Sequence, residues 1–158
     1  MDDLAKKLGQ RLKAGRERVV TAESCTGGWV AQVVTSVAGS SDWFERGFVT
    51  YSNAAKNELL RVKQSTLKKH GAVSEQTARE MALGALARSK GTVALAVTGV
   101  AGPGGGTPDK PVGMVCFAWV HEKNLKSETR RFSGDRESVR RQSVIRALEG
   151  VLETLAGG

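Results

Sequence analysis

The sequence predicts an α/β fold: a single three-layer α/β/α domain with a mixed, mostly parallel sheet. Strand-like apolar runs alternate with helical stripes along the chain, as in sheets covered by helices. The run 93–97 is almost entirely apolar, which is typical of a strand buried on both faces. The chain has 158 residues and is 40% hydrophobic, enough to bury one core without disulfides. We therefore expect one domain over residues 1–158.

The sequence predicts a first helix, followed along the chain by a unit of strand, turn and helix. Leucines at fourfold spacing in the first twelve residues predict an amphipathic helix that ends near Gly15. A β-favouring run predicts a strand over Arg18–Ala22, and the polar, glycine-containing stretch 23–28 predicts a turn. Apolar residues on one face then predict a helix over Trp29–Val37.

The middle of the chain supplies the strand that we expect at the centre of the sheet. Aromatic and β-branched residues predict a second strand over Arg46–Ser52, followed by a short helix through Leu60. Ser74 can cap a longer helix that carries a stripe of small apolar residues. The strand Val93–Val97 follows that helix.

The last third of the chain contains a hairpin and a long helix. Five glycines predict a loop over Thr98–Lys110. A strand is expected over Val112–Val120, with an antiparallel partner over Glu128–Phe132 across a turn at Lys123–Asn124. A clean apolar stripe predicts a final helix that begins near Asp135.

The charge and composition narrow the choice of function. The formal net charge of +8 favours encounter with phosphate-bearing partners. Only eight aromatic residues accompany the dispersed basic residues, which argues against a surface that stacks single-stranded nucleic acid. The N-terminal segment lacks the apolar run of a signal peptide or membrane span, so we expect a cytoplasmic protein with no membrane partner. Cys25 and Cys116 are too few for a disulfide framework and are expected to stay reduced.

Two polar loops follow the predicted strands that end at Ala22 and Val97. Open α/β sheets bind ligands at the carboxyl ends of their strands, so these loops could share one crevice. Neither loop carries a nucleotide-binding fingerprint, and each taken alone is a weak signal. Glu23 and Ser24 could equally be local helix caps.

Several long motifs, in register over essentially the whole chain, make the sequence recognisable. It resembles the CinA C-terminal domain family in the stretches Thr21–Gly28, Ala38–Ser41, Gly47–Asn53, Lys56, His70–Ser74, Thr98–Pro103, Lys110–Gly113 and Phe132–Arg136. The resemblance implies a nicotinamide-nucleotide amidohydrolase that converts nicotinamide mononucleotide to nicotinic acid mononucleotide and ammonia, in pyridine nucleotide recycling. By that resemblance the proposed catalytic serine, tyrosine and lysine are Ser41, Tyr51 and Lys56.

These residue types suit the implied reaction. A serine hydroxyl becomes a good nucleophile when a neighbouring base takes its proton, and a lysine can be that base only when burial or nearby positive charge lowers its pKa. We therefore expect Lys56 to be partly buried and Ser41 Oγ to attack the carboxamide carbon. Tyr51 could relay a proton or hold Lys56 in place. Considered without the resemblance, Ser41 could instead cap a short segment, and Lys56 could be a solvated lysine.

The substrate also carries a ribose and a phosphate. Backbone amides of the Thr26-Gly27-Gly28 turn, or Arg136 and Arg140 on the final helix, are expected to bind the phosphate. The expected substrate-binding residues on the loops are Ser24, Thr26, Gly27, Gly28, Thr98, Gly99, Ala101 and Gly102.

No cofactor or metal is expected, because His70 and His121 are the only histidines and no set of acidic residues and histidines has ligand spacing. The alternative functions are a nucleotide-binding or regulatory module without turnover and a DNA-related protein. The sequence leaves the oligomeric state open, with Trp43 and Phe44 as candidates for an interface in a homo-oligomer.

Overall fold

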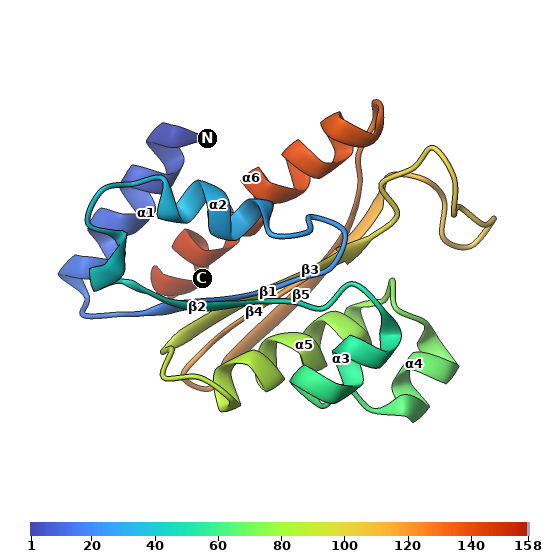
Figure 1. Cartoon of the computed structure of the whole chain (residues 1–158), viewed down its shortest axis with the longest axis horizontal. Coiled ribbons are helices and arrows are strands. Elements are labelled where there is room, and N and C mark those ends of the chain that lie inside the picture. Colours follow the sequence, from blue (N-terminus) through green and yellow to red (C-terminus); the bar gives the residue numbers. More distant parts are fainter. Residues whose placement is uncertain (158) are drawn as a thin grey trace.

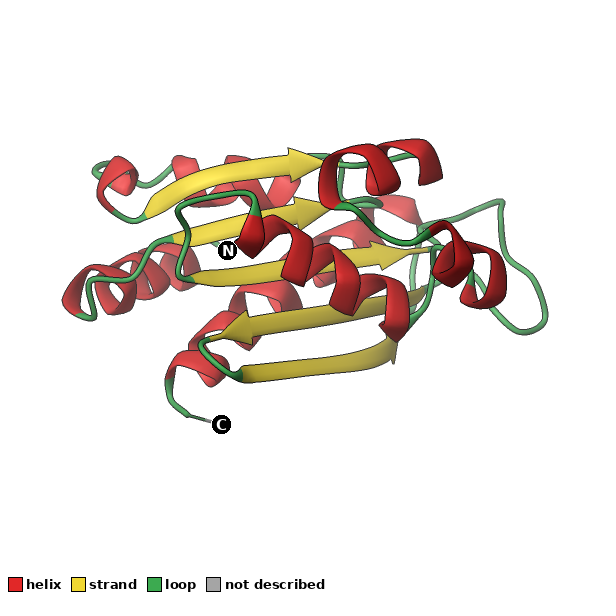
Figure 2. Cartoon of the chain, turned by 90° about the horizontal axis from the view of Figure 1, so that it is seen from below, coloured by secondary structure: helices red, strands yellow, loops and turns green. Residues whose placement is uncertain are grey.

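The chain forms one five-stranded sheet in the order β2-β1-β3-β4-β5 in the computed structural model, which describes residues 1–157. β1 pairs in parallel with both β2 and β3, whereas β4 is antiparallel to β3 and to β5. Only β4 therefore runs against the other strands (Figure 2). The strands are β1 (Val19–Glu23), β2 (Phe44–Val49), β3 (Val93–Gly99), β4 (Met114–His121) and β5 (Asn124–Arg131).

Helices cover both faces of the sheet, which confirms the predicted three layers (Figure 1). The helices α1, α2 and α6 lie on one face, and α3, α4 and α5 lie on the other. They span α1 (Asp2–Ala14), α2 (Trp29–Thr35), η1 (Ser40–Asp42, a short 3₁₀ turn), α3 (Asn53–Leu60), α4 (Gln64–His70), α5 (Glu75–Ala87) and α6 (Arg136–Leu155).

The central strand divides the hydrophobic core in two. Val93, Leu95 and Val97 of β3 join the cluster beneath α1, α2 and α6, and the alternate residues Ala94 and Ala96 join the cluster beneath α5. This follows from the two-residue period of a strand. β3 is buried along nearly its whole length, as its apolar sequence predicts.

α6 packs closely on β4 because the helix residue at the contact, Gly150, has no side chain. A Cβ atom at Gly150 would lie 2.0 Å from the Trp119 ring, so only glycine fits there without rearrangement. The indole N–H of Trp119 donates to the backbone oxygen of Ala147 at 2.9 Å, which satisfies its one polar atom in the core.

The predicted elements are present, and the differences lie at their ends. β2 begins at Phe44 and ends at Val49, two to three residues before the predicted bounds. The hairpin turn lies at Glu122–Lys123 and β5 already begins at Asn124, because Glu122 takes the left-handed conformation (φ 56°) that a tight turn needs. α4 is an additional helix that the sequence analysis did not predict, since none of its residues is buried.

Trp43 is not available for the subunit interface that the sequence suggested at Trp43 and Phe44. Its side chain is 3% exposed and packs against Gly9 of α1 within the chain, and Phe44 packs against the same core. Cys25 and Cys116 are both buried and unpaired, as expected from the sequence. In the described part of the chain, no helix is both long enough and apolar enough to cross a membrane.

Candidate active site

A cavity of about 190 Å³ lies where the carboxyl ends of β1 and β3 meet. The two loops that follow these strands contribute to one cavity, as the sequence predicts. The segment between α4 and α5, the start of α3 and the first residue of α6 complete its wall. It is lined by Ser24, Cys25, Tyr51, Lys56, Ala72, Val73, Thr98, Gly99, Ala101 and Arg136.

A buried carboxylate fixes the turn that carries Ser24. Glu23, the last residue of β1, is fully buried, and its carboxylate accepts hydrogen bonds from Thr26 Oγ1 at 2.6 Å and from the N–H groups of Val30 and Ala31 at 2.9 and 3.0 Å. Glu23 thus caps α2 from the preceding strand, where its negative charge is favourable. The chain must then turn sharply, and Ser24 is held between the end of a strand and the start of a helix.

Lys56 reaches the cavity from α3. Ser52 caps that helix by accepting a hydrogen bond from the N–H of Ala55, which fixes where the helix begins. Lys56 Nζ lies 2.9 Å from Ser24 Oγ and donates to the backbone oxygens of Thr50 at 2.9 Å and Tyr51 at 3.1 Å. The side chain is only 1% exposed, so the expectation that Lys56 is buried is confirmed.

The surroundings of Lys56 favour its neutral form. Burial lowers the pKa of the Lys56 ammonium from 10.5 to about 8. Within residues 1–157, no carboxylate lies close enough to Nζ to form an ion pair. A neutral amine has two N–H groups, which match the two carbonyl oxygens, and one lone pair, which then faces Ser24 Oγ. The arrangement therefore suits a base that takes the serine proton.

Ser41 does not meet Lys56, so the structure does not bring this part of the predicted catalytic set together. Ser41 lies in η1, before β2, whereas Lys56 lies after β2. Phe44 at the start of β2 pairs with Val19 at the start of β1, so η1 is at the amino ends of the strands and Ser24 at their carboxyl ends. A strand of six residues, about 20 Å long, separates the two positions.

Tyr51 lies at the mouth of the cavity. Its side chain is 61% exposed, and its hydroxyl accepts a hydrogen bond from Arg136 Nη2 at 3.4 Å. Its backbone oxygen, and not its hydroxyl, contacts Lys56. The predicted role in holding Lys56 therefore falls to the main chain of Tyr51, and the phenol faces the entrance.

The expectation that the Thr26-Gly27-Gly28 turn binds phosphate through its amides does not fit the structure for the two glycines. The N–H of Gly28 donates to the Glu23 carboxylate at 3.2 Å, and the N–H of Gly27 donates to the backbone oxygen of Ser24 at 3.0 Å. Thr26 is fully buried and its hydroxyl is bound to Glu23. The amides of Gly27 and Gly28 are therefore occupied in shaping the turn, whereas the N–H of Thr26 donates to no oxygen in residues 1–157.

The other predicted binding residues fall into two groups. Thr98, Gly99 and Ala101 line the cavity as predicted. Gly102 does not line it, and its backbone oxygen accepts a hydrogen bond from Arg136 Nη1 at 2.9 Å. Arg140 does not line the cavity. Its side chain donates to the backbone oxygens of Cys25 and Thr26, and so holds the serine turn against α6.

Arg136 joins the cavity to a second, more open depression. That depression has a volume of about 490 Å³ and is lined by Trp29, Arg136, Glu137 and Arg140. We call this depression the open shelf. A ligand that extends out of the small cavity would pass the guanidinium of Arg136 and reach the open shelf, where Arg140 and the indole of Trp29 also lie.

The described residues contain no cluster of three or more histidine, cysteine, aspartate or glutamate side chains able to hold a metal ion. The chemical groups that the cavity does bring together are a hydroxyl, a buried amine and backbone amides. This set is suited to acyl transfer through a serine.

Sequence reasoning missed the position of Ser24 as the partner of Lys56 and the anchoring role of Glu23. Both residues were noted only as possible caps or binding residues. The signal was present, because Ser24 directly follows a buried strand and precedes a helix, the geometry of a nucleophile exposed on a strand-to-helix turn.

Comparisons with known proteins identify the family and agree with the fold. Residues 1–155 match the model of the CinA C-terminal domain. The chain is 54% identical to nicotinamide-nucleotide amidohydrolase PncC of Escherichia coli (strain K12), over 92% of this chain and 89% of that protein. It is 52% identical to the protein of the same name from Pseudomonas putida, over 95% and 94% of the two chains. The crystal structure of competence/damage inducible protein CihA from Agrobacterium tumefaciens superposes with a TM-score of 0.95 at 45% identity, covering 98% of this chain and 94% of that chain.

Proposed function

Because this chain belongs to the CinA C-terminal domain family, we propose that it is a nicotinamide-nucleotide amidohydrolase. The reaction converts nicotinamide mononucleotide to nicotinic acid mononucleotide and ammonia, and serves the recycling of pyridine nucleotides in the cytoplasm. The observation that carries the proposal is the 2.9 Å contact between Ser24 Oγ and Lys56 Nζ at the wall of the cavity.

The proposed first step forms an acyl-enzyme. Neutral Lys56 Nζ takes the proton of Ser24 while Oγ bonds to the carboxamide carbon. When the tetrahedral species collapses, the C–N bond breaks and the proton passes from Lys56 to the nitrogen, which leaves as ammonia. The nicotinoyl group is then an ester of Ser24.

The second step restores the enzyme. A water molecule attacks the ester carbonyl and gives a proton to Lys56, and the ester bond to Ser24 Oγ breaks as that proton returns to the serine. The products are a carboxylic acid and the original hydroxyl. Lys56 thus acts as base and acid in turn, which a group with a pKa of about 8 can do near neutral pH.

The negative oxygen of each tetrahedral species needs hydrogen-bond donors. The N–H groups of Cys25 and Thr26 directly follow the nucleophile, and neither donates to an oxygen atom anywhere in residues 1–157. We assign the N–H of Cys25 to the oxyanion hole, because Cys25 lines the cavity and a donor fixed in a buried site stabilises developing charge without reorganisation. Thr26 is fully buried and does not line the cavity. Glu23 and Arg140 keep the turn that carries these groups in place.

The sizes of the two hollows suggest how the substrate lies. A cavity of about 190 Å³ is smaller than a typical small-molecule site, which takes about 300 Å³ or more, and matches the pyridine ring with its carboxamide. The ribose and phosphate would then extend past Tyr51 to Arg136 and onto the open shelf. The two volumes and the arginines of the open shelf therefore fit a substrate with a small ring at one end and an anion at the other.

The direct test is to incubate the protein with nicotinamide mononucleotide, measure ammonia and identify the second product. We expect stoichiometric ammonia and nicotinic acid mononucleotide. Saturable binding without ammonia would instead indicate a nucleotide-binding module. Steeply salt-dependent association with DNA, again without ammonia, would indicate the DNA-related alternative.

The variant Arg136→Ala should raise KM for nicotinamide mononucleotide by about tenfold or more, since a charge-assisted hydrogen bond is worth about 1.5–3 kcal/mol. The reaction with nicotinamide riboside, which lacks the phosphate, should change little. Steady-state kinetics with both substrates checks this, and Arg141→Ala, one residue from Arg140 on the same helix and paired with Glu137, is the matched control. An equal loss with both substrates would mean that Arg136 only holds the loop at Gly102.

A further inference from the structure

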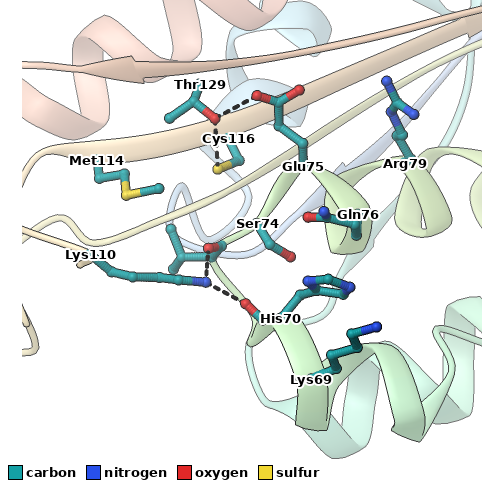
Figure 3. A pocket seen from close by; sticks show the side chains of 11 residues that line it. Lys69, His70, Ser74, Glu75, Gln76, Arg79, Lys110, Met114, Cys116 and Thr129 are labelled. Carbon is teal, nitrogen blue, oxygen red and sulfur yellow. Dashed lines mark hydrogen bonds between the residues drawn. The ribbon is translucent and has the colours of Figure 1, made fainter.

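A second hollow, larger than the catalytic cavity, lies outside the candidate active site. It has a volume of about 610 Å³, within the range of small-molecule sites, and lies between the end of α4, the start of α5 and the strands β4 and β5 (Figure 3). Its lining residues are Lys69, His70, Val73, Ser74, Glu75, Gln76, Arg79, Lys110, Met114, Cys116 and Thr129. We call it the α4–α5 cavity.

Three cations and one carboxylate line the α4–α5 cavity, which gives a formal charge of +2 before any contribution from His70. The cations are Lys69, Arg79 and Lys110. In the part of the chain that the structure describes, none of the three forms an ion pair. Uncompensated positive charge in a concave site attracts anions, because the cavity walls focus the field.

The one carboxylate in the cavity is already engaged. Glu75 accepts hydrogen bonds from the hydroxyls of Ser127 and Thr129, each at 2.8 Å, and so points toward β5 (Figure 3). It makes no ion pair with the lysines or with Arg79, which donates instead to Ser127 Oγ at 2.7 Å. The carboxylate therefore lowers the formal charge of the lining to +2 but forms an ion pair with none of the three cations.

Lys110 is the most constrained of the three cations. Its ammonium extends from the glycine-rich loop and donates to the backbone oxygens of His70 and Val73 (Figure 3). Carbonyl oxygens are neutral partners that do not offset the formal charge of an ammonium, and a third N–H remains free to donate. The Lys110 ammonium is therefore held in place at the cavity wall, where it can bind an anion without first breaking an ion pair.

We propose that the α4–α5 cavity is a second binding site, for a phosphate-bearing small molecule held by Lys69, Arg79 and Lys110. Guanidinium and ammonium groups are the usual ligands of phosphate, and the apolar side chains of Val73 and Met114 give the rest of such a molecule a surface to pack on. The site is separate from the catalytic cavity, although Val73 lines both and forms a wall between them.

The test is a calorimetric titration of the full chain with inorganic pyrophosphate and with AMP. We expect saturable binding that weakens with added salt, and a loss of about tenfold or more in the double variant Lys69→Ala/Arg79→Ala. Lys68→Ala, which removes an exposed lysine that does not line the cavity, should bind like the unaltered protein. Tighter binding of AMP than of pyrophosphate would indicate that a nucleoside also contacts the cavity. Lys69→Ala alone provides a second variant if the double variant is destabilised.

Binding at Arg136 must be distinguished from binding in the α4–α5 cavity. Amide chemical shifts of the labelled protein locate the ligand, and we expect the largest changes at Lys69, Val73 and Lys110. The proposal is overturned if neither probe binds saturably, if the double variant binds as tightly as the unaltered protein, or if the shift changes centre on Arg136. None of these measurements requires turnover, so they stand apart from the test of the amidohydrolase.

Discussion

Ser24→Ala should lower the rate of ammonia release from nicotinamide mononucleotide by at least about 1,000-fold, because loss of a serine nucleophile removes the covalent route altogether. Substrate binding should change little, since the alanine keeps the turn and Glu23 still caps α2. Single-turnover kinetics and a binding titration together check both parts. The unaltered protein, but not this variant, should also form an ester that can be trapped by rapid acid quenching and seen by mass spectrometry.

Ser41→Ala is the matched control and should keep full activity within about twofold. Ser41 lies at the amino ends of the strands and contributes nothing to the cavity. The opposite result, full activity in Ser24→Ala and loss in Ser41→Ala, would refute the pairing of Ser24 with Lys56. Each variant lacks one serine hydroxyl oxygen, so the two changes are chemically identical and differ only in position.

The parts of the fold that could be predicted are those whose apolar residues recur with a clear period. β3 is buried on both faces and reads as an unbroken apolar run, and α6 keeps its stripe over five turns. α4 went unpredicted because it is short, polar and without buried residues, so its sequence carries no period. The ends of β2 were misplaced for a related reason: β2 is an edge strand with no fully buried residue.

The candidate site was predicted in part, and the error has a physical cause. The chemistry required a buried lysine, and Lys56 is buried. Separation along the sequence, however, says nothing about which end of a strand a residue occupies. Ser41 and Lys56 lie fifteen positions apart with a whole strand between them, whereas Ser24 and Lys56 lie thirty-two positions apart and meet.

A stricter use of one rule would have selected Ser24. In an open α/β sheet the ligand lies at the carboxyl ends of the parallel strands, so a nucleophile and its base must both follow strands. Ser24 follows β1 and Lys56 follows β2, whereas Ser41 precedes β2. The hydrogen bonds of Glu23 could not be predicted in the same way, because they depend on how the turn folds back over the carboxylate.

Lys56→Met should also lower the rate of ammonia release by about 100-fold to 10,000-fold, the usual contribution of a general base. Methionine fills a similar volume but has no basic nitrogen, so Ser24 loses the group that takes its proton. The carbonyl oxygens of Thr50 and Tyr51 also lose this donor, at a cost of about 1–3 kcal/mol for the buried oxygen of Thr50. Thermal unfolding of the variant therefore belongs beside the kinetics, with Lys68→Met as the control for an exposed lysine.

The pH dependence of the rate separates a loss of base from a loss of structure. Burial lowers the pKa of the Lys56 ammonium to about 8, and the neutral amine is the active form. In the unaltered protein kcat/KM should therefore rise about tenfold per pH unit below this pKa and level off above it. The residual activity of Lys56→Met should lack that inflection, as should Lys56→Arg, because a guanidinium stays charged throughout this range. An inflection that survives in Lys56→Met would assign the titrating group to another residue and remove Lys56 from the proton transfer.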